Sequence, residues 1–302
     1  MCKLFILTLS LLLASSFPEM AAAKLNVFAC EPEWAALAKE IGGDQVDVYT
    51  ATTASQNPHQ IQARPSLIAR AHQADLMICS GAELESGWLP QVQRQSANSR
   101  IQRSGPGYFE ASSVVQRLEV PTVLDRAEGD IHPGGNPHIQ TNPHHIAAVA
   151  AALAERMSAI DPDGAADYQR RAADFRGRWD AAITRWETAA ARLKGTAIVI
   201  HHQYWRYLTD WLQLHEVATL EPKPGIPPTV THLGQVLATL AQRPARLIIR
   251  TPYDDPQPSQ WLAERAAIPA VVLPGTVGGL PGTEDLFGLF EVTVNELLKA
   301  VP

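Results

Sequence analysis

The chain has 302 residues, of which 46% are hydrophobic, and a formal net charge of −6 at pH 7. About 300 residues exceed one comfortable hydrophobic core, so two domains are expected. No cluster of basic residues occurs, and a weakly acidic chain does not condense on phosphate backbones. These properties exclude nucleic acid as the expected partner.

The first 23 residues predict a cleavable export signal. Lys3 precedes an apolar stretch from Leu4 to Leu13, and Ala21 to Ala23 supply the small side chains that a signal peptidase needs. That stretch is too short to span a bilayer, and no later segment approaches about 18 uninterrupted apolar residues. Cys2 lacks a preceding lipobox. We therefore expect a periplasmic protein that neither spans the membrane nor carries a lipid anchor.

Strand-like and helix-like segments alternate through the first part of the mature chain. Apolar runs predict strands at 25–30, 46–50 and 76–79, with helices at 32–41 and 65–73 between them. This alternation is typical of a parallel sheet with helical crossovers. Ligands of such sheets bind beyond the carboxyl ends of the strands, and the loop that carries His59 follows the second run.

Cys30 and Cys79 are the only cysteines after the export signal, and each ends one of these apolar runs. Neighbouring parallel strands would bring the two thiols within disulfide reach, and an exported protein would be oxidised there. The alternative is a pair of small, buried hydrophobic side chains.

A long helical segment separates the two halves. Asp161 and Pro162 form an N-cap and first-turn signature, Gly195 ends the run, and apolar side chains recur at helical spacing between them. A helix over 162–193 would be about 48 Å long. The alternative is two shorter helices broken near Gly177.

A second alternating pattern follows this segment. Its apolar runs predict strands at 196–200, 217–220, 245–249 and 270–273, and helices at 204–213, 231–241, 258–266 and 286–301. We therefore predict an export signal at 1–23, a first α/β lobe at 24–160, a connecting helix at 161–195 and a second α/β lobe at 196–302. The fold class is α/β, with two three-layer βαβ lobes on parallel sheets and a rigid connecting helix.

Three segments present a histidine in a setting that suits a metal ligand. His59 and His138 each follow Asn-Pro, where proline stiffens the loop, and His201 and His202 follow a buried apolar run. Adjacent residues of an extended chain point to opposite sides, so only one of that pair should face a site. Neutral imidazole is the commonest protein ligand of Zn²⁺. The pattern indicates a metal site between the two halves of the chain.

The other histidines carry weaker signals. His132 lies in the Gly- and Pro-rich loop at 125–137, where it could pass metal inward, although a solvated loop histidine is the expected account. His144 and His145 sit at a helix start and are expected to be exposed or capping. The sequence does not match the enzyme motifs we compared. His215-Glu216 begins like the His-Glu-x-x-His motif of zinc hydrolases, but Thr219 stands in place of the second histidine. We therefore predict that the chain is not an enzyme.

Nearly the whole mature chain resembles the zinc and manganese solute-binding proteins of bacterial ABC importers, the ZnuA and TroA-like class. NPHQIQARPS at 57–66 resembles the first ligand loop of that family, an Asp-Pro-His followed by a Pro-Ser helix start. NPHIQTNP at 136–143 is similar to the motif of the second ligand, and HQYWRYL at 202–208 to that of the third. ADLMICSGAELESGWL at 74–89 resembles the strand and turn of the family.

The resemblance implies a metal site in the interlobe cleft with His59, His138 and His202 as ligands. It also implies a fourth ligand, an aspartate after the last strand, but Leu273 to Thr276 contains no carboxylate. Asp285 could reach back to the metal, with N-cap of the last helix as its alternative role. Glu284 or water could instead complete the site.

The ligand set predicts the cargo. Three imidazoles with at most one carboxylate suit tetrahedral Zn²⁺, whereas Mn²⁺ prefers oxygen-rich sites. We therefore expect a monomeric, periplasmic protein that captures Zn(II) and delivers it to an inner-membrane ABC permease. The alternatives are a secreted zinc hydrolase, with Glu221 or Glu284 as general base, and an adhesin or metallochaperone on the same fold.

Overall fold

The computed structural model describes residues 23–123, 125, 127 and 129–301. Apart from Ala23, the predicted export signal therefore lies outside the described residues. Within the described part of the chain, no helix combines the length and the apolar character needed to cross a membrane.

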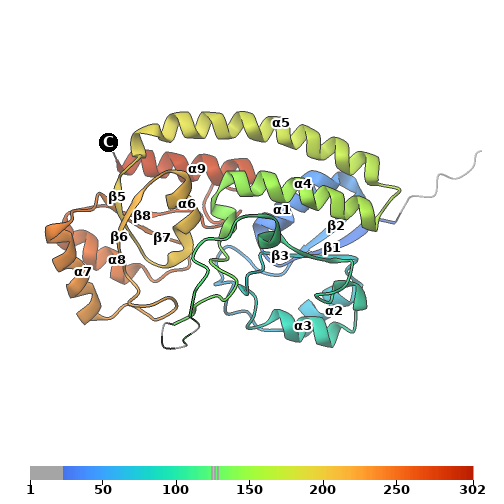
Figure 1. Ribbon diagram of the computed structural model, residues 1–302, viewed down its shortest axis with the longest axis horizontal. Coiled ribbons are helices and arrows are strands. Elements are labelled where there is room, and N and C mark those ends of the chain that lie inside the picture. The colour runs from blue at the N-terminus through green and yellow to red at the C-terminus, as the bar shows by residue number, and fades with distance from the viewer. Residues whose placement is uncertain (1–22, 124, 126, 128, 302) are drawn as a thin grey trace, which may run out of the picture.

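The first lobe is built on a four-stranded parallel sheet with the strand order β2-β1-β3-β4 (Figure 1). Its strands are β1 (Leu25–Ala29), β2 (Val46–Thr50), β3 (Leu76–Cys79) and β4 (Tyr108–Glu110). The helices that precede residue 161 are α1 (Pro32–Gly42), α2 (Pro65–Gln73), α3 (Leu89–Ser96) and α4 (Pro143–Ile160). The predicted parallel arrangement is confirmed, and β4 and α3 are additional elements.

The second lobe repeats this strand order, with β6-β5-β7-β8 in a parallel sheet. Its strands are β5 (Ala197–Ile200), β6 (His215–Thr219), β7 (Leu247–Arg250) and β8 (Ala270–Val272), and its helices are α6 (Arg206–Trp211), α7 (Val230–Gln242), α8 (Pro256–Ala266) and α9 (Leu286–Ala300). In each sheet the first strand lies between the second and third. The connections that follow β1 and β3, and those that follow β5 and β7, therefore leave toward opposite sides of their sheet, the arrangement that binds ligands in open sheets.

Each sheet is covered by helices on both faces, because alternate strand residues point to opposite sides. In the first sheet, Phe28 and Met77 pack with Leu67 of α2, whereas Val27 and Ile78 pack toward α1 and α4. The second sheet divides in the same way, with α7 and α8 on one face. On the other face, the buried cluster continues from the first lobe into the second without a break. The three-layer prediction is confirmed, and the lobes share one core.

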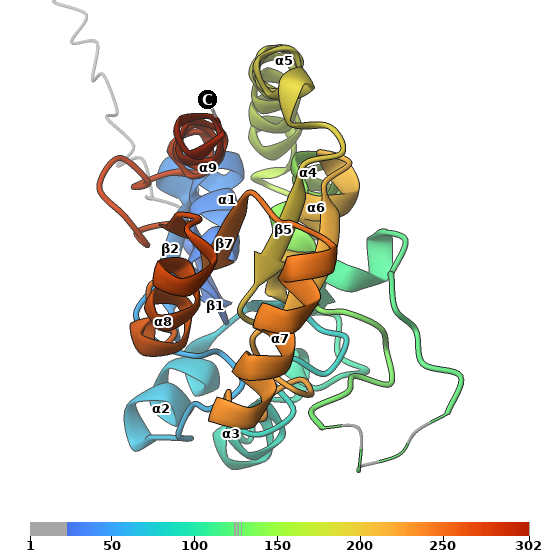
Figure 2. The ribbon, with the colours of Figure 1, turned by 90° about the vertical axis from the view of Figure 1, so that its left-hand side faces the viewer.

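Helix α5 (Ala165–Ala190) runs along both lobes above this shared core (Figures 1 and 2). It passes through the exposed Gly177 without interruption, and at 1.5 Å per residue its 26 residues extend about 39 Å. It begins later than predicted, because Asp161 is not its N-cap. The Asp161 carboxylate instead accepts hydrogen bonds from the Tyr168 hydroxyl, at 2.6 Å, and from the Gly164 N–H.

Aromatic side chains fix α5 against α9. Trp179 contacts both Phe287 and Phe290, with ring centroids 4.9 and 5.4 Å away, and Trp186 stacks on Phe290 at 5.3 Å. The indole of Trp186 also donates to Oε2 of Glu291 at 2.8 Å. Buried aromatic pairs contribute about 0.5–1.5 kcal/mol each beyond their area. The last helix of the second lobe is therefore fastened to the helix that spans both lobes.

The predicted disulfide is confirmed: Cys30 and Cys79 are bonded at the carboxyl ends of the adjacent strands β1 and β3. Beside it lies a buried acidic cluster of Glu31, Glu33 and Glu85. Glu33 accepts a hydrogen bond from Thr276 of the second lobe. Burial raises the pKa of Glu33 and of Glu85 to about 7. Glu33 thus joins the two lobes, whereas Glu31 and Glu85 accept hydrogen bonds from Ser80 and Gly81 of the first lobe.

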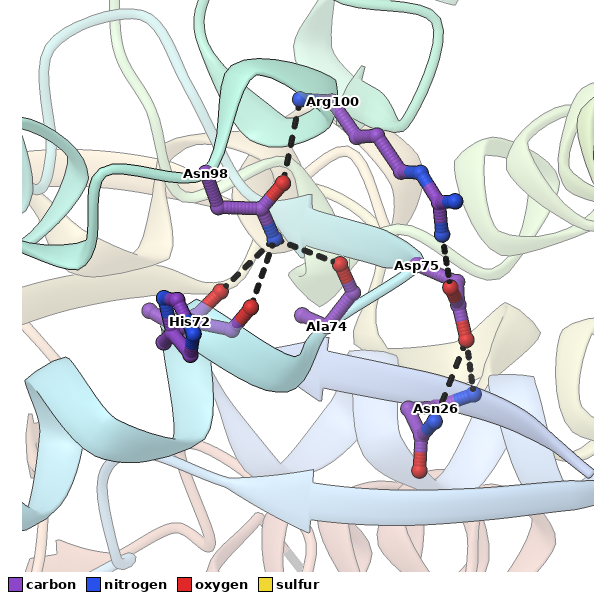
Figure 3. Close-up of polar contacts among 7 residues, drawn as sticks. Asn26, His72, Ala74, Asp75, Asn98 and Arg100 are labelled. Atoms are coloured by element: carbon purple, nitrogen blue, oxygen red, sulfur yellow. Dashed lines mark hydrogen bonds and ion pairs between the residues drawn. The ribbon is translucent and has the colours of Figure 1, made fainter.

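Polar contacts secure the opposite end of the first sheet, where β1 and β3 begin (Figure 3). Asp75 accepts from both nitrogens of Asn26 and pairs with Arg100 at 2.5 Å. The side-chain nitrogen of Asn98 donates to the carbonyls of His72 and Ala74. A cavity of about 1060 Å³ opens at this end. It lies away from the sheet edge where β1 and β3 finish.

Candidate metal centre

Three loops from different parts of the chain bring His59, His138 and His202 together. His59 follows β2, His138 lies between β4 and α4, and His202 is the second residue after β5. Their ring centroids are 5.4 to 5.8 Å apart, and one ligand atom from each lies within 4.8 Å of the other two. Two of these histidines come from the first lobe and one from the second, and their role as metal ligands stays a prediction.

The repeated Asn-Pro-His tripeptide forms the same turn in both loops. The Oδ1 atom of Asn57 accepts from the His59 N–H at 3.0 Å, and Asn136 does the same for His138, also at 3.0 Å. The asparagine side chain thus closes a local turn over the intervening proline, a conformation that suits this residue. Each histidine is presented by a stiff loop.

Several ring nitrogens at this centre are buried without a hydrogen-bond partner among the described residues. They are Nε2 of His59 and both nitrogens of His138. Burial holds the pKa of His138 well below its usual range, and the nearby His59 and His202 lower it further. Neutral imidazole keeps a lone pair for a metal, whereas an unpaired buried nitrogen otherwise costs stability. The donor chemistry therefore fits a metal ion.

His202 has a carboxylate partner in its own lobe. Its Nδ1 lies 2.7 Å from Oε2 of Glu221, which also accepts from the Gly225 N–H at 2.9 Å. An ionised carboxylate only accepts, so Nδ1 donates and Nε2 keeps the lone pair. The neighbouring His201 is buried elsewhere and belongs to no group of three potential ligands in the described part of the chain.

The loop ahead of His138 contributes two further side chains. Oδ2 of Asp130 lies 3.3 Å from Nδ1 of His59, and the His132 ring lies 5.1 Å from the His59 ring. The hydrogen bond with His59 lowers the pKa of Asp130, and burial lowers that of His132 to about 4. His132 is partly buried, not a solvated loop residue as expected. Asp130 was missed, although it precedes His132 by two residues.

The structure does not bring Asp285 or Glu284 to the histidines. Asp285 is the N-cap of α9, where its Oδ1 accepts from the Gly288 N–H at 2.7 Å. Glu284 is exposed and accepts from the Gly282 N–H. Neither residue belongs to a group of three potential ligands among the residues that the structure describes. His144, also considered from the sequence, pairs with Glu187 at 2.8 Å on the surface.

Two tyrosines of the second lobe hold the His138 loop. The Tyr204 ring packs against His138 with centroids 4.3 Å apart, and its hydroxyl donates to the Gly275 carbonyl at 2.6 Å. The Tyr207 hydroxyl donates to the Asn136 carbonyl at 2.7 Å. A cavity of about 60 Å³ lies between the loops and is lined by Asp130, His132, His138 and His202, among others. The centre is therefore lined by residues of both lobes.

Curated relatives are distant and cover part of the chain. The metal ABC transporter substrate-binding lipoprotein ScbA of Streptococcus cristatus is 25% identical over 155 residues, 51% of this chain and 48% of that relative. The manganese ABC transporter substrate-binding lipoprotein PsaA of Streptococcus mitis is 25% identical over 182 residues, 59% and 57% of the two chains. The chain spans about half the length of the curated relatives it matches.

Solved structures share the fold over most of the chain. A crystal structure of ZnuA has a TM-score of 0.75 at 17% identity and covers 92% of this chain and 99% of its own. A Mn-bound periplasmic metal binding protein from Candidatus Liberibacter asiaticus has a TM-score of 0.74 at 16% identity, with 91% and 99% covered. A family model described as ZnuA, zinc-uptake complex component A, periplasmic, matches residues 27–300. The chain therefore belongs to the ZnuA family.

Proposed function

We propose that this protein is the periplasmic solute-binding component of an ABC importer. It captures one Zn(II) ion through His59, His138 and His202 and delivers it to an inner-membrane permease. The observation that carries the proposal is the group of three histidines from both lobes, with buried and unpaired ring nitrogens. Membership of the ZnuA family supports the role in import.

The donor set favours zinc over manganese. Three imidazole nitrogens suit the tetrahedral geometry of Zn²⁺, with water or one further ligand in the fourth position, whereas Mn²⁺ prefers more oxygen ligands. The named PsaA relatives are manganese proteins, so the family alone does not decide the cargo. The Glu221 carboxylate orients His202 and is not itself among the three grouped ligands.

A carrier accounts for this centre better than a hydrolase does. Glu221, considered as a general base, is already engaged by His202 and Gly225. The cavity beside the histidines is small, about 60 Å³. A catalytic zinc site needs an open coordination position beside a substrate pocket. Release to the permease would come from movement of the ligand loops, since α5 and the shared core tie the lobes together.

Zinc titration of the purified mature chain tests the proposal. We expect one Zn²⁺ per chain, bound in preference to Mn²⁺ when both are offered. His59→Ala, His138→Ala and His202→Ala should each weaken binding at least tenfold, since each removes a ligand. His144→Ala, which alters an exposed surface pair, is the matched control. Unchanged affinity in all three site variants would refute the assignment.

A further inference from the structure

A second set of potential ligands lies on the outer side of His59. It consists of His59, Asp130 and His132, and one ligand atom from each lies within 4.8 Å of the other two. Asp130 approaches Nδ1 of His59 to 3.3 Å, and the ring of His132 is 5.1 Å from that of His59. His59 is therefore common to this set and to the three-histidine group.

Asp130 of the outer set is far more exposed than any of the three histidines of the inner group. The Asp130 side chain is 53% exposed and that of His59 is 10% exposed, whereas His138 is 1% exposed. Asp130 and His132 also line the cavity that reaches His138 and His202. An ion that enters from solvent therefore meets the carboxylate and the loop histidine before it meets the buried nitrogens.

The backbone holds Asp130 in this place. Its N–H donates to the Pro224 carbonyl of the second lobe at 2.8 Å, and the Gly135 N–H donates to the His132 carbonyl at 2.9 Å. Gly225 lies so close to Asp130 that an added Cβ would be 3.0 Å from the Asp130 Cβ. Asp130 is thus positioned by contacts with the segment that follows Glu221, and His132 by a turn within its own loop.

We propose that His59, Asp130 and His132 form an outer binding position for a divalent transition-metal ion, through which the cargo passes to the three-histidine centre. This inference rests on the proposed function. Two imidazoles and one carboxylate, completed by water, are donors that Zn²⁺ accepts. The carboxylate also gives this entrance a negative charge that attracts cations.

The shared ring makes the two positions alternatives. A neutral imidazole has one lone pair, so His59 binds an ion through Nδ1 outside or through Nε2 inside, but not both. Passage inward breaks the bond at Nδ1 and forms one at Nε2, while the ring proton leaves Nε2 and returns at Nδ1. In that position the Nδ1–H of His59 faces Oδ2 of Asp130, which accepts a hydrogen bond from it. The outer position is a stage in capture and adds no second stored ion.

Blocking the inner centre exposes the outer position to direct measurement. In the double variant His138→Ala, His202→Ala, calorimetric titration with Zn²⁺ alone should find one weak site. Adding His132→Ala or Asp130→Asn should weaken that site at least tenfold, because each removes a ligand. His144→Ala in the same background is the matched control and should leave it intact. A site that is absent, or that persists when His132 is replaced, would overturn the proposal.

A rate measurement keeps the test decisive if the double variant does not fold. In the otherwise intact chain, His132→Ala should slow zinc capture several-fold in stopped-flow mixing, and His144→Ala should not. An unchanged rate would refute the relay. Failure of this inference differs from failure of the proposed function: in the first case the native chain still binds zinc through its three histidines, and in the second it does not.

Discussion

Glu221 and His202 face each other across the carboxyl ends of two paired strands, with Nδ1 of His202 2.7 Å from Oε2 of Glu221. The β5–β6 register places Ile200 opposite Thr219, so the residues two positions further along are also opposite. The carboxylate selects the tautomer whose Nε2 lone pair is available to a metal.

We expect Glu221→Ala to weaken zinc binding by roughly 10–100-fold, the usual effect of losing the carboxylate behind a ligand histidine. Glu221→Gln should have a smaller effect, because its amide oxygen still accepts from Nδ1. Competition titration with a chromophoric chelator measures both. Glu264→Ala, which alters an exposed side chain of α8, is the control. Native affinity in Glu221→Ala would show that the contact does not orient the ligand.

The two Asn-Pro-His turns should respond differently to aspartate. Asn57→Asp should retain zinc affinity, because a carboxylate also accepts from the His59 N–H. Asn136→Asp should be destabilised by about 1–3 kcal/mol, because the Asn136 amide also donates to the Gln203 carbonyl and to Glu119. Urea unfolding and zinc titration of both variants provide the comparison. Equal behaviour of the two would contradict this account.

Stability should depend on pH through Glu33. Burial raises its pKa from 4.5 to about 7, so the folded chain holds a proton that the unfolded chain releases between these values. The protonated Glu33 contributes fully to the free energy of unfolding below about pH 4.5. This contribution, up to about 3 kcal/mol, is lost as the pH rises to about 7. Glu33→Gln, a neutral mimic, should flatten that part of the metal-free unfolding profile, and Glu264→Gln should not. A profile in Glu33→Gln as steep as that of the native chain would exclude Glu33 as its source.

Asp285 should act on stability and not on zinc affinity. Asp285→Ala removes the cap of α9 and should lower the unfolding free energy by about 1 kcal/mol, whereas Asp285→Asn preserves it. Thermal unfolding without metal and zinc titration separate the two roles. A tenfold loss of affinity in both variants would instead identify Asp285 as a ligand.

Most of the fold could be predicted from local patterns. Val46–Thr50, Pro65–Gln73 and Leu76–Cys79 have the predicted bounds, because short apolar runs and Pro-initiated helices are strong local signals. The predicted start of α5 was wrong, because the Asp161 carboxylate accepts a hydrogen bond from Tyr168 and does not cap the helix. The strand β4 was missed, as three residues carry no periodicity.

The site was predictable only as far as sequence motifs reached. The two Asn-Pro-His turns and the position after β5 identify three histidines. The pairing of Glu221 with His202 depends on the register of two strands. The pairing of Asp130 with His59 depends on the conformation of a Gly-rich loop. Neither leaves a local pattern. Asp285, in contrast, does have a local pattern: its position ahead of the last helix predicts an N-cap, and the structure shows that cap.

The aromatic contacts between α5 and α9 have a consequence for the heat-capacity change of metal binding. Trp179, Trp186 and Phe290 belong to one continuous apolar core that both lobes share. We therefore expect an arriving ion to move only a few polar loops. Heat-capacity changes follow the apolar surface that is buried. We therefore expect zinc binding to show a heat-capacity change close to zero. If the protein serves an importer as we propose, the loaded and empty states would then differ in the order of the loops, at nearly constant molecular shape.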